Sequence, residues 1–251
     1  MSGTKAIFIT VRSASTRLPN KAYLTINNKK TIEYVIDQAK KSHLSDMIVL
    51  CTTLNPEDDE LCNIATKNNI KYYRGSVDDK LDRWLQAAKE NNIDFFVTAV
   101  GDDLFCSYEL MDLAFEQYER NDSDFIQGDG LVSGSFTYGI STKALAKACQ
   151  IKDTDQTEMM WVYFTETGIC DVESLENVPS LYLRSDIRMT LDYKEDFLFF
   201  EKVIKSLAKN FNTRDVLSFL DENKEVIQIN YFLEDAWKQN QVSKTTLDLK
   251  S

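Results

Sequence analysis

Three cationic side chains follow the first apolar run of the chain within a span of ten residues. Arg12, Arg17 and Lys21 come directly after the run at residues 6–11. A planar guanidinium group matches the paired oxygens of a phosphate, and an ammonium group can follow a negative charge as it moves. The segment therefore predicts a loop that binds a phosphate chain, and the alternative is a solvated basic turn. Hydroxyl groups that could add hydrogen bonds to such a ligand lie in the same loop, at Ser13, Ser15 and Thr16.

This loop differs from the common glycine-rich phosphate-binding motifs. Neither G-x-x-x-x-G-K-[ST] nor G-x-G-x-x-G occurs in the sequence, which contains only eight glycines. The formal net charge of −11 predicts a surface that repels the phosphate backbone of a nucleic acid, so we expect no nucleic-acid partner. A small anionic ligand needs only a local cluster of cations.

Two acidic residues at the ends of extended segments are the next candidates for chemistry. Asp102 follows Gly101 and the apolar run at residues 95–99, so its carboxylate is expected at the ligand-binding edge of a sheet. Asp103 could be a second ligand, a solvated neighbour or the cap of a helix that starts near Ser107. We favour the solvated or capping role over that of a ligand. Asp192 ends an extended run, and taken alone it reads as a helix N-cap with Glu195 completing a capping box.

The composition does not favour a disulfide framework, a zinc site, a histidine-based catalytic site or a membrane span. The five cysteines form no Cys-x-x-Cys pair, so we expect free buried thiols, and the single histidine, His43, is expected at the surface. No apolar stretch approaches the roughly 20 residues that a membrane span needs. The first residues do not resemble a secretory signal, and we therefore expect a cytoplasmic protein without a membrane partner.

The elements that must position these residues alternate between strands and helices. Strands are expected at residues 6–10, 47–51, 71–73 and 95–99, with helices at 31–41, 56–68, 80–91 and 108–119. This order predicts an α/β fold with a mostly parallel sheet flanked by helices. Because ligands bind at the carboxyl ends of parallel strands, the basic loop, "GSVDD" at 75–79 and "VGDD" at 100–103 should share one rim.

The second half of the chain changes in pattern at about residue 128. We expect one domain over 1–251, with residues 128–180 as a smaller acceptor or dimerisation lobe inserted in it. This lobe should hold a strand and helices at 142–149 and 155–165. An extended segment at 181–192 and helices at 195–208, 213–222 and 233–239 should follow.

Several sequence blocks together resemble one enzyme family. The segment "RSASTRLPNK" resembles the R-x-x-S-T-R-L-P-x-K signature of the sugar-acid cytidylyltransferases, in the branch that includes 3-deoxy-manno-octulosonate cytidylyltransferase and the spore-coat polysaccharide biosynthesis cytidylyltransferase. Similarity continues in the same order through "TIEYVIDQAKKS", "VLCTTLNPEDDELCNIA", "YYRGSVDDKLDRWLQAA" and "RMTLDYKEDFLFFEKV". The blocks extend over most of the chain. Asn20 and Ala14 depart from the commonest forms of the signature, but neither change removes a charge.

The resemblance implies a nucleotide-diphospho-sugar transferase fold, which is GT-A-like and Rossmann-like, and transfer of CMP from CTP with release of pyrophosphate. It places Mg²⁺ on Asp102 and Asp192, because Mg²⁺ takes few protein oxygens and keeps several waters. It assigns catalytic roles to Arg12, Arg17, Lys21 and the two aspartates. The triphosphate is assigned to Arg12, Ser15, Thr16, Arg17 and Lys21.

The resemblance also implies where the cytosine base lies. The implied nucleotide-binding residues at the strand ends are Thr52, Thr53, Arg74, Gly75 and Ser76, and Asp82 with Arg83 on the following helix would brace their loop. For Asp82, a purely structural salt bridge is an equal alternative. The preference for CTP over UTP rests on the resemblance alone.

The acceptor side is expected to differ from known family members. Two acidic residues of the spore-coat branch are absent from "LVSGSFTYGIST", so the acceptor cannot be copied from that branch. Tyr138, Glu158 and Arg188 are our candidate acceptor-binding residues. A helix-surface role is the alternative for Glu158, and a contact with the released pyrophosphate is the alternative for Arg188. The apolar residues 159–164 are predicted to form a contact in a homodimer.

We therefore expect a Mg²⁺-dependent cytidylyltransferase whose acceptor is a sugar acid, sugar phosphate or phosphonate, for surface polysaccharide synthesis. One alternative is a glycosyltransferase of related fold that consumes a nucleotide sugar. Such enzymes place Asp-x-Asp after the fourth strand, whereas this chain has Gly101-Asp102-Asp103. The other alternative is a non-catalytic nucleotide-binding protein.

Overall fold

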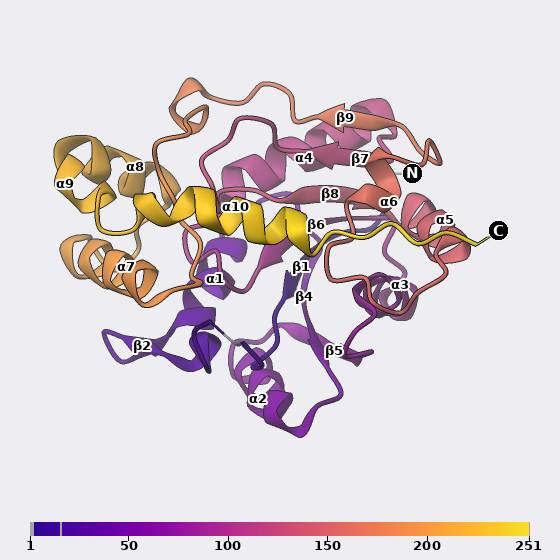
Figure 1. The fold of residues 1–251 in the computed structure, drawn as a ribbon, viewed down its shortest axis with the longest axis horizontal. Coiled ribbons are helices and arrows are strands. Elements are labelled where there is room, and N and C mark those ends of the chain that lie inside the picture. Colours follow the sequence, from indigo (N-terminus) through magenta and orange to yellow (C-terminus); the bar gives the residue numbers. More distant parts are fainter. Residues whose placement is uncertain (1–2, 16, 251) are drawn as a thin grey trace.

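The centre of the protein is a seven-stranded sheet with strand order β5-β4-β1-β6-β8-β7-β9 (Figure 1). The computed structural model describes residues 3–15 and 17–250. The parallel part consists of β1 (Lys5–Thr10), β4 (Met47–Thr53), β5 (Lys71–Gly75) and β6 (Phe95–Val100). Beyond β6, β8 (Tyr138–Ser141) runs antiparallel, followed by β7 (Phe125–Gln127) and β9 (Val172–Ser174). The expected α/β fold is confirmed.

β1 is an inner strand of the sheet, between β4 and β6, and its side chains pack on both faces. Its six residues are buried, and Ile9 pairs with Leu50 of β4 and Ala99 of β6. Successive side chains of a strand point to opposite faces. Accordingly Ile9 packs in one apolar cluster, whereas Phe8 packs in the other. Burial on both faces explains why the strand reads as a continuous apolar run.

Helices cover both faces of the sheet. One apolar cluster receives side chains from α1 (Thr31–Ala39), α2 (Asp59–Lys67) and α4 (Tyr108–Asn121), together with α7 (Lys194–Ser206) and α8 (Thr213–Glu222). The other cluster receives them from α3 (Lys80–Asn91), α5 (Thr142–Ile151) and α6 (Val162–Thr165). The segment 128–180 thus supplies β8 and β9 to the main sheet and two helices to one face.

Several element bounds differ from the prediction. The expected helix at 56–68 is divided into a 3-10 turn at Pro56–Asp58 and α2, and the helix expected at 155–165 is only α6. The polar run before α6 makes turn contacts instead, because the Thr157 hydroxyl donates to Asp79 and accepts from the Leu81 amide. The short hairpin of β2 (Thr25–Ile26) and β3 (Lys29–Lys30) was not predicted. Its turn uses Asn27 and Asn28 with positive φ, as tight hairpin turns require.

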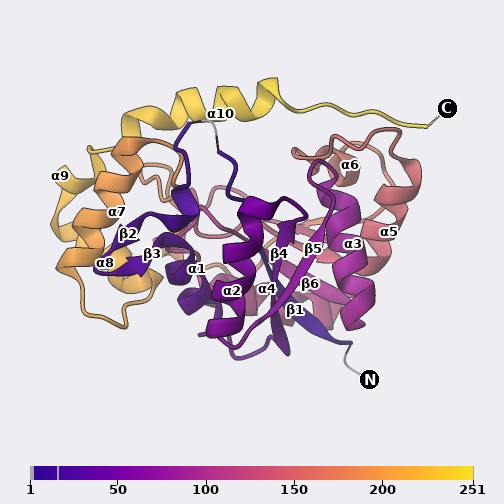
Figure 2. The same ribbon diagram turned by 90° about the horizontal axis from the view of Figure 1, so that it is seen from below.

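The last part of the chain crosses the molecule. After α8, the chain forms α9 (Lys224–Ile227), a 3-10 turn at Tyr231–Leu233 and α10 (Glu234–Ser243). Figures 1 and 2 show α10, in yellow, running from the α7 to α9 side across the sheet edge toward α5 and α6. Within the described residues, no helix is both long and apolar enough to span a membrane.

Candidate active site

The predicted functional segments meet at the carboxyl edge of the parallel strands. Arg12, Thr53, Gly75 and Asp102 lie at or just beyond the ends of β1, β4, β5 and β6. The loops of β1 and β6 pack closely, since the Gly101 amide donates to the Thr10 carbonyl over 2.9 Å. A Cβ atom on Gly101 would lie 2.6 Å from the Val11 Cβ atom. The absence of a side chain at this position lets Asp102 approach the basic loop.

Lys21 is the point at which the two distant aspartates converge. Its ammonium group lies 2.5 Å from Asp102 Oδ2 and 2.9 Å from Asp192 Oδ1. The backbone also joins the two acidic segments, because the Leu191 amide donates to the Asp102 carbonyl over 2.9 Å. Asn20, with φ of 55°, turns the chain before Lys21. The structure therefore brings Lys21, Asp102 and Asp192 into one cluster.

Burial makes this cluster electrostatically strong. The side chains of Lys21 and Asp192 are 10% and 4% exposed. Burial alone would lower the pKa of Lys21, but the Asp102 and Asp192 carboxylates raise it above its ordinary value. Burial opposes ionisation of Asp192, yet Lys21 and Arg17 hold its pKa below the ordinary value. Lys21 and Asp192 are both charged in this arrangement.

Arg17 is the second cation of the cluster. One terminal nitrogen lies 2.5 Å from Asp192 Oδ1, and the other donates to Asn240 Oδ1 of α10 over 2.8 Å. The centre of its guanidinium group is 5.6 Å from the centroid of the Tyr193 ring. Ser15 Oγ accepts a 3.4 Å hydrogen bond from the Leu18 amide. Thr16, predicted in the same loop, lies outside the described residues.

Asp192 is positioned by a buried network. Asp196 Oδ2 accepts hydrogen bonds from the backbone amides of Asp192 and Tyr193, and its carboxylate pairs with Arg188 at 2.9 Å. Tyr193 is the N-cap of α7 and Asp196 completes the capping box, so the predicted cap at Asp192 with Glu195 is wrong. The predicted and the observed capping pairs are offset by one residue, which explains why the sequence pattern did not distinguish them.

Arg188 lies in this network and away from solvent. Its side chain is 0% exposed, and its nitrogens contact Asp196, Glu234 at 3.0 Å and Asp192 Oδ2 at 3.7 Å. A side chain enclosed in this way does not face an acceptor in this structure. The arrangement gives Arg188 a supporting role behind Asp192, in place of the predicted acceptor contact.

Asp58 is a supporting residue that the sequence did not reveal. It is fully buried and accepts hydrogen bonds from the Ser13 amide at 2.7 Å, the Thr52 hydroxyl at 2.9 Å and the Thr53 hydroxyl at 2.5 Å. The two threonines predicted to read the base thus donate their hydroxyls to Asp58. Their role in this structure is to tie β4 to the basic loop. Asp58 belongs to the acidic run 57–60, which reads as an ordinary helix start.

The two arginines predicted near the base also brace backbone. Arg74 donates to the carbonyls of Thr53 and Asn55. Arg83 is 2% exposed and donates to the Ser76 carbonyl over 2.6 Å, while its Nε is buried without a partner among the described residues. A Cβ atom on Gly75 would lie 2.9 Å from the Arg83 side chain, which explains the glycine. Asp82 accepts from Gln86 over 2.9 Å and its amide donates to the α3 cap, Asp79.

Asp103 is neither a solvated neighbour nor a helix cap. It is 7% exposed, and α4 is capped by Ser107, whose hydroxyl accepts from the Leu110 amide. Burial, followed by the charge of Asp102, raises the pKa of Asp103 to about 8. The expectation for Asp103 was therefore wrong, because the extended segment that carries Asp192 covers it.

The segment 128–180 contributes Glu158 and Tyr138 to the surroundings of the site. Glu158 lies 3.1 Å from Arg12, and its carbonyl accepts from Lys80 over 2.7 Å. Lys80 lowers the pKa of Glu158 against the opposing effect of burial, and Arg12 adds to the lowering. Tyr138 packs on Phe125 with ring centroids 5.1 Å apart.

The apolar residues predicted to form a dimer contact lie mostly in the core. Met160, Tyr163 and Phe164 are at most 2% exposed, and Phe164 stacks on Phe125. These three side chains are not available to a second copy. For these three residues the prediction is wrong, because an apolar run has the same appearance in a core and in an interface; a contact through the half-buried Met159 and Trp161 stays a prediction.

The site offers a cation two carboxylate oxygens from different segments. Asp102 and Asp192 already hold one positively charged group, Lys21, between them, so a cation at this position satisfies both. No cluster of three or more His, Cys, Asp or Glu side chains suited to a metal occurs among the described residues. Two carboxylates fit Mg²⁺, which takes one or two protein carboxylates together with substrate phosphates.

Comparisons with known proteins show the family to which the chain belongs. The family profile described as "Cytidylyltransferase" matches residues 6–236. An uncharacterized protein of Methanocaldococcus jannaschii is 31% identical, with coverage of 88% of this chain and 92% of the relative. The spore coat polysaccharide biosynthesis protein SpsF of Bacillus subtilis is 22% identical over 84% of this chain and 88% of its own.

Solved structures show the same fold. A cytidylyltransferase from Leptospira borgpetersenii superposes with a TM-score of 0.79 and 25% identity, over 91% of this chain and 97% of that one. A CMP:2-keto-3-deoxy-manno-octonic acid synthetase complexed with CTP gives a TM-score of 0.63 at 14% identity, over 80% and 98% of the two chains. The resemblance found in the sequence is therefore confirmed: the chain belongs to the cytidylyltransferase family and is a nucleotidyltransferase that uses CTP.

Proposed function

We propose that this protein transfers CMP from CTP to a small anionic acceptor, in a Mg²⁺-dependent reaction that releases pyrophosphate. The acceptor class is a sugar acid, sugar phosphate or phosphonate, and the product serves surface glycan synthesis in the cytoplasm. The observation that carries the proposal is the cluster in which Lys21 contacts both Asp102 and Asp192, with Arg17 beside them. This cluster combines ligands for a cation with donors for a triphosphate.

The reaction fits the charges of the cluster. An acceptor oxygen forms a bond to the α-phosphorus, and the bond from that phosphorus to the bridging oxygen breaks, so pyrophosphate leaves with the electron pair. Asp102 and Asp192 would hold Mg²⁺, which supplies charge neutralisation for the phosphate oxygens when it is bound. Lys21 and Arg17 donate hydrogen bonds to the oxygens on which negative charge accumulates.

Lys21 and Arg17 must change partners when the nucleotide binds. In this structure both cations neutralise the carboxylates. A phosphate chain that arrives with its own cation presents oxygens to the two side chains and a positive charge to the two aspartates. The side chains then move from carboxylate to phosphate without leaving a charge unpaired, so the cluster suits a metal-bound triphosphate.

The acceptor is expected between the β1 loop and the segment 128–180. Glu158 of this segment contacts Arg12 at 3.1 Å, and Tyr138 lies on β8, which pairs with β6. His43, the only histidine, lies outside the site and has its ring against Tyr108 of α4. An acceptor phosphate or phosphonate oxygen needs no general base, whereas a sugar hydroxyl would transfer its proton to a carboxylate or to metal-bound water.

The test is a pyrophosphate-release screen with CTP and UTP against sugar acids, sugar phosphates and phosphonates. We expect CTP-dependent pyrophosphate release with at least one acceptor class, and loss of release in Asp102→Ala. Release of a nucleoside diphosphate from a nucleotide sugar would instead identify a glycosyltransferase. Tight CTP binding without turnover across the whole panel would identify a non-catalytic nucleotide-binding protein. Light scattering on the same samples tests the homodimer, which stays a prediction.

A further inference from the structure

The C-terminal strap, residues 234–250, crosses the sheet edge where the candidate site lies. It consists of α10 and the tail that follows it, and it runs from the α7 to α9 side to the α5 to α6 side in both views (Figures 1 and 2). The family match ends at residue 236. Most of the strap therefore lies beyond the part of the chain that the family profile describes, and its role needs a separate argument.

The first anchor of the strap is its connection to the network behind Asp192. Glu234, 6% exposed at its side chain, lies 3.0 Å from Arg188. The indole ring of Trp237 lies over the same guanidinium group, with 5.1 Å from its centre to the ring centroid. Removal of a buried charge partner is strongly unfavourable, so this end of α10 is firmly held.

The second anchor reaches a residue of the site. Asn240 Oδ1 accepts a 2.8 Å hydrogen bond from one terminal nitrogen of Arg17, whose other terminal nitrogen pairs with Asp192. The guanidinium group of Arg17 is thus held at both of its terminal nitrogens. Arg17 Nε is buried and has no partner among the described residues. A hydrogen bond to a charged group is stronger than one between neutral groups, so the Asn240 contact constrains Arg17 substantially.

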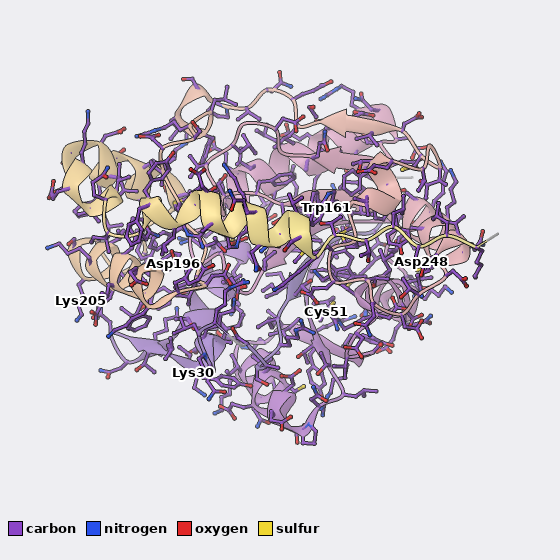
Figure 3. All side chains as sticks on the ribbon, viewed as in Figure 1. Lys30, Cys51, Trp161, Asp196, Lys205 and Asp248 are labelled. Carbon is purple, nitrogen blue, oxygen red and sulfur yellow. The ribbon has the colours of Figure 1, made fainter. Side chains whose placement is uncertain are left out.

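The third anchor fastens the tail to the segment 128–180. The Asp153 amide donates to the Asp248 carbonyl over 2.9 Å, and the Lys250 amide donates to the Ile151 carbonyl over 2.9 Å. The Tyr163 hydroxyl donates to the same Asp248 carbonyl over 3.2 Å. Figure 3 shows Asp248 at the far end of the strap from α10. The strap is therefore fixed at both ends, with Asn240 between the fixed points.

We propose that Asn240 is a positioning residue for Arg17, and that the strap holds it in place by its two ends. Asn240 holds one terminal nitrogen of Arg17, so that the other terminal nitrogen can pass from Asp192 to a triphosphate oxygen while the guanidinium group stays in place. This inference rests on the proposed function of the basic loop. It assigns to the strap a part in nucleotide binding that the family profile does not contain.

The first test compares Asn240→Ala with Gln239→Ala, a matched control on an exposed neighbouring position of α10. We expect Asn240→Ala to raise the KM for CTP about tenfold, with kcat within about twofold, because about 1.4 kcal/mol of preorganising contact corresponds to a factor of ten. Gln239→Ala should leave both constants unchanged. A KM for CTP in Asn240→Ala equal to that of the control would overturn the proposal.

The second test does not depend on turnover. Hydrogen–deuterium exchange is measured on the full chain, on Asn240→Ala and on a chain that ends at Ser243. Both variants should exchange faster than the full chain at residues 12–21 and equally at the central strands β1, β4 and β6. Unchanged exchange at residues 12–21 in both variants would refute the proposal. Absence of pyrophosphate release in the full chain would refute the proposed function, while exchange at residues 12–21 would still decide the role of the strap.

Discussion

Replacement of Lys21 by methionine tests the cation cluster most directly. The change removes the charge that lies 2.5 Å from Asp102 and 2.9 Å from Asp192, while a chain of similar length remains. Breaking a buried ion pair by removal of one partner destabilises by about 3–5 kcal/mol. Because Arg17 still contacts Asp192, we expect the lower end, about 3 kcal/mol. For a chain of this length that corresponds to a fall in Tm of about 6–12 °C.

Mg²⁺ should then restore part of the lost stability. Without Lys21 the two carboxylates repel each other, and a divalent cation can take the vacated position without displacing an ammonium group. A ligand at one hundred times its Kd stabilises the folded state by about 2.7 kcal/mol. The variant should therefore show a larger increase in Tm with MgCl2 than the natural chain does, and no increase with MgCl2 plus EDTA.

The measurement is thermal unfolding with and without MgCl2, with Lys205→Met as control. Lys205 forms an exposed pair with Glu201 at 2.8 Å, so its removal should change the free energy of unfolding by less than about 1 kcal/mol. The control should also respond to Mg²⁺ like the natural chain. If Lys21→Met were as stable as the control, or if Mg²⁺ stabilised all three proteins equally, the assignment of this cluster as a cation site would be wrong.

Three further substitutions separate catalytic from supporting roles. Asp192→Ala should abolish pyrophosphate release while circular dichroism stays unchanged, and normal turnover would remove Asp192 from the site. Arg188→Met should reduce the free energy of unfolding, measured in urea, by about 3–5 kcal/mol, because it leaves buried carboxylates unpaired. Unchanged stability together with a raised KM for the acceptor would contradict the supporting role of Arg188. Asp58→Asn should lower stability at neutral pH. Burial alone would raise the pKa of Asp58, but hydrogen bonds from Thr53, Ser13 and Thr52 hold it below the ordinary value. A carboxyl group whose pKa is lower in the folded protein than in the unfolded chain stabilises the folded state at pH values above its unfolded pKa of about 3.9. This stabilisation is lost as the pH falls through the pKa of the folded state. The stability difference between the natural chain and Asp58→Asn should therefore shrink below about pH 4, and a constant difference would contradict this account.

The strands and the convergence of the site were predictable from the sequence for a physical reason. Parallel strands buried on both faces read as apolar runs, and their carboxyl ends necessarily share one edge. Asp102 could therefore be placed near the basic loop from periodicity alone. Asp192 could not, because it reaches the cluster through the extended segment that pairs with residue 102 by a backbone hydrogen bond. Its assignment came from the family resemblance.

The supporting residues were harder to predict because their roles depend on tertiary contacts. Asp58 and Asp196 each lie in a run of acidic residues at a helix start, where any carboxylate suits the helix dipole. Only the fold shows which of them turns inward. Thr52 and Thr53 illustrate the same limit, since a hydroxyl at a strand end can face a ligand or, as here, a buried carboxylate. Asn240 carries no local signal at all, because its partner is more than 200 residues away in the chain.

The charge balance of the site explains why these supporting contacts matter. Lys21 and Arg17 are paired with the carboxyl groups of Asp102 and Asp192, so the resting cluster holds no excess of positive charge, within a chain of net charge −11. Such a site exerts little long-range attraction on an anionic nucleotide. Affinity must instead come from donors held in the correct orientation before the ligand arrives. We therefore expect the contacts that fix Lys21, Arg17 and Asp192 to determine nucleotide binding more than the number of cations does.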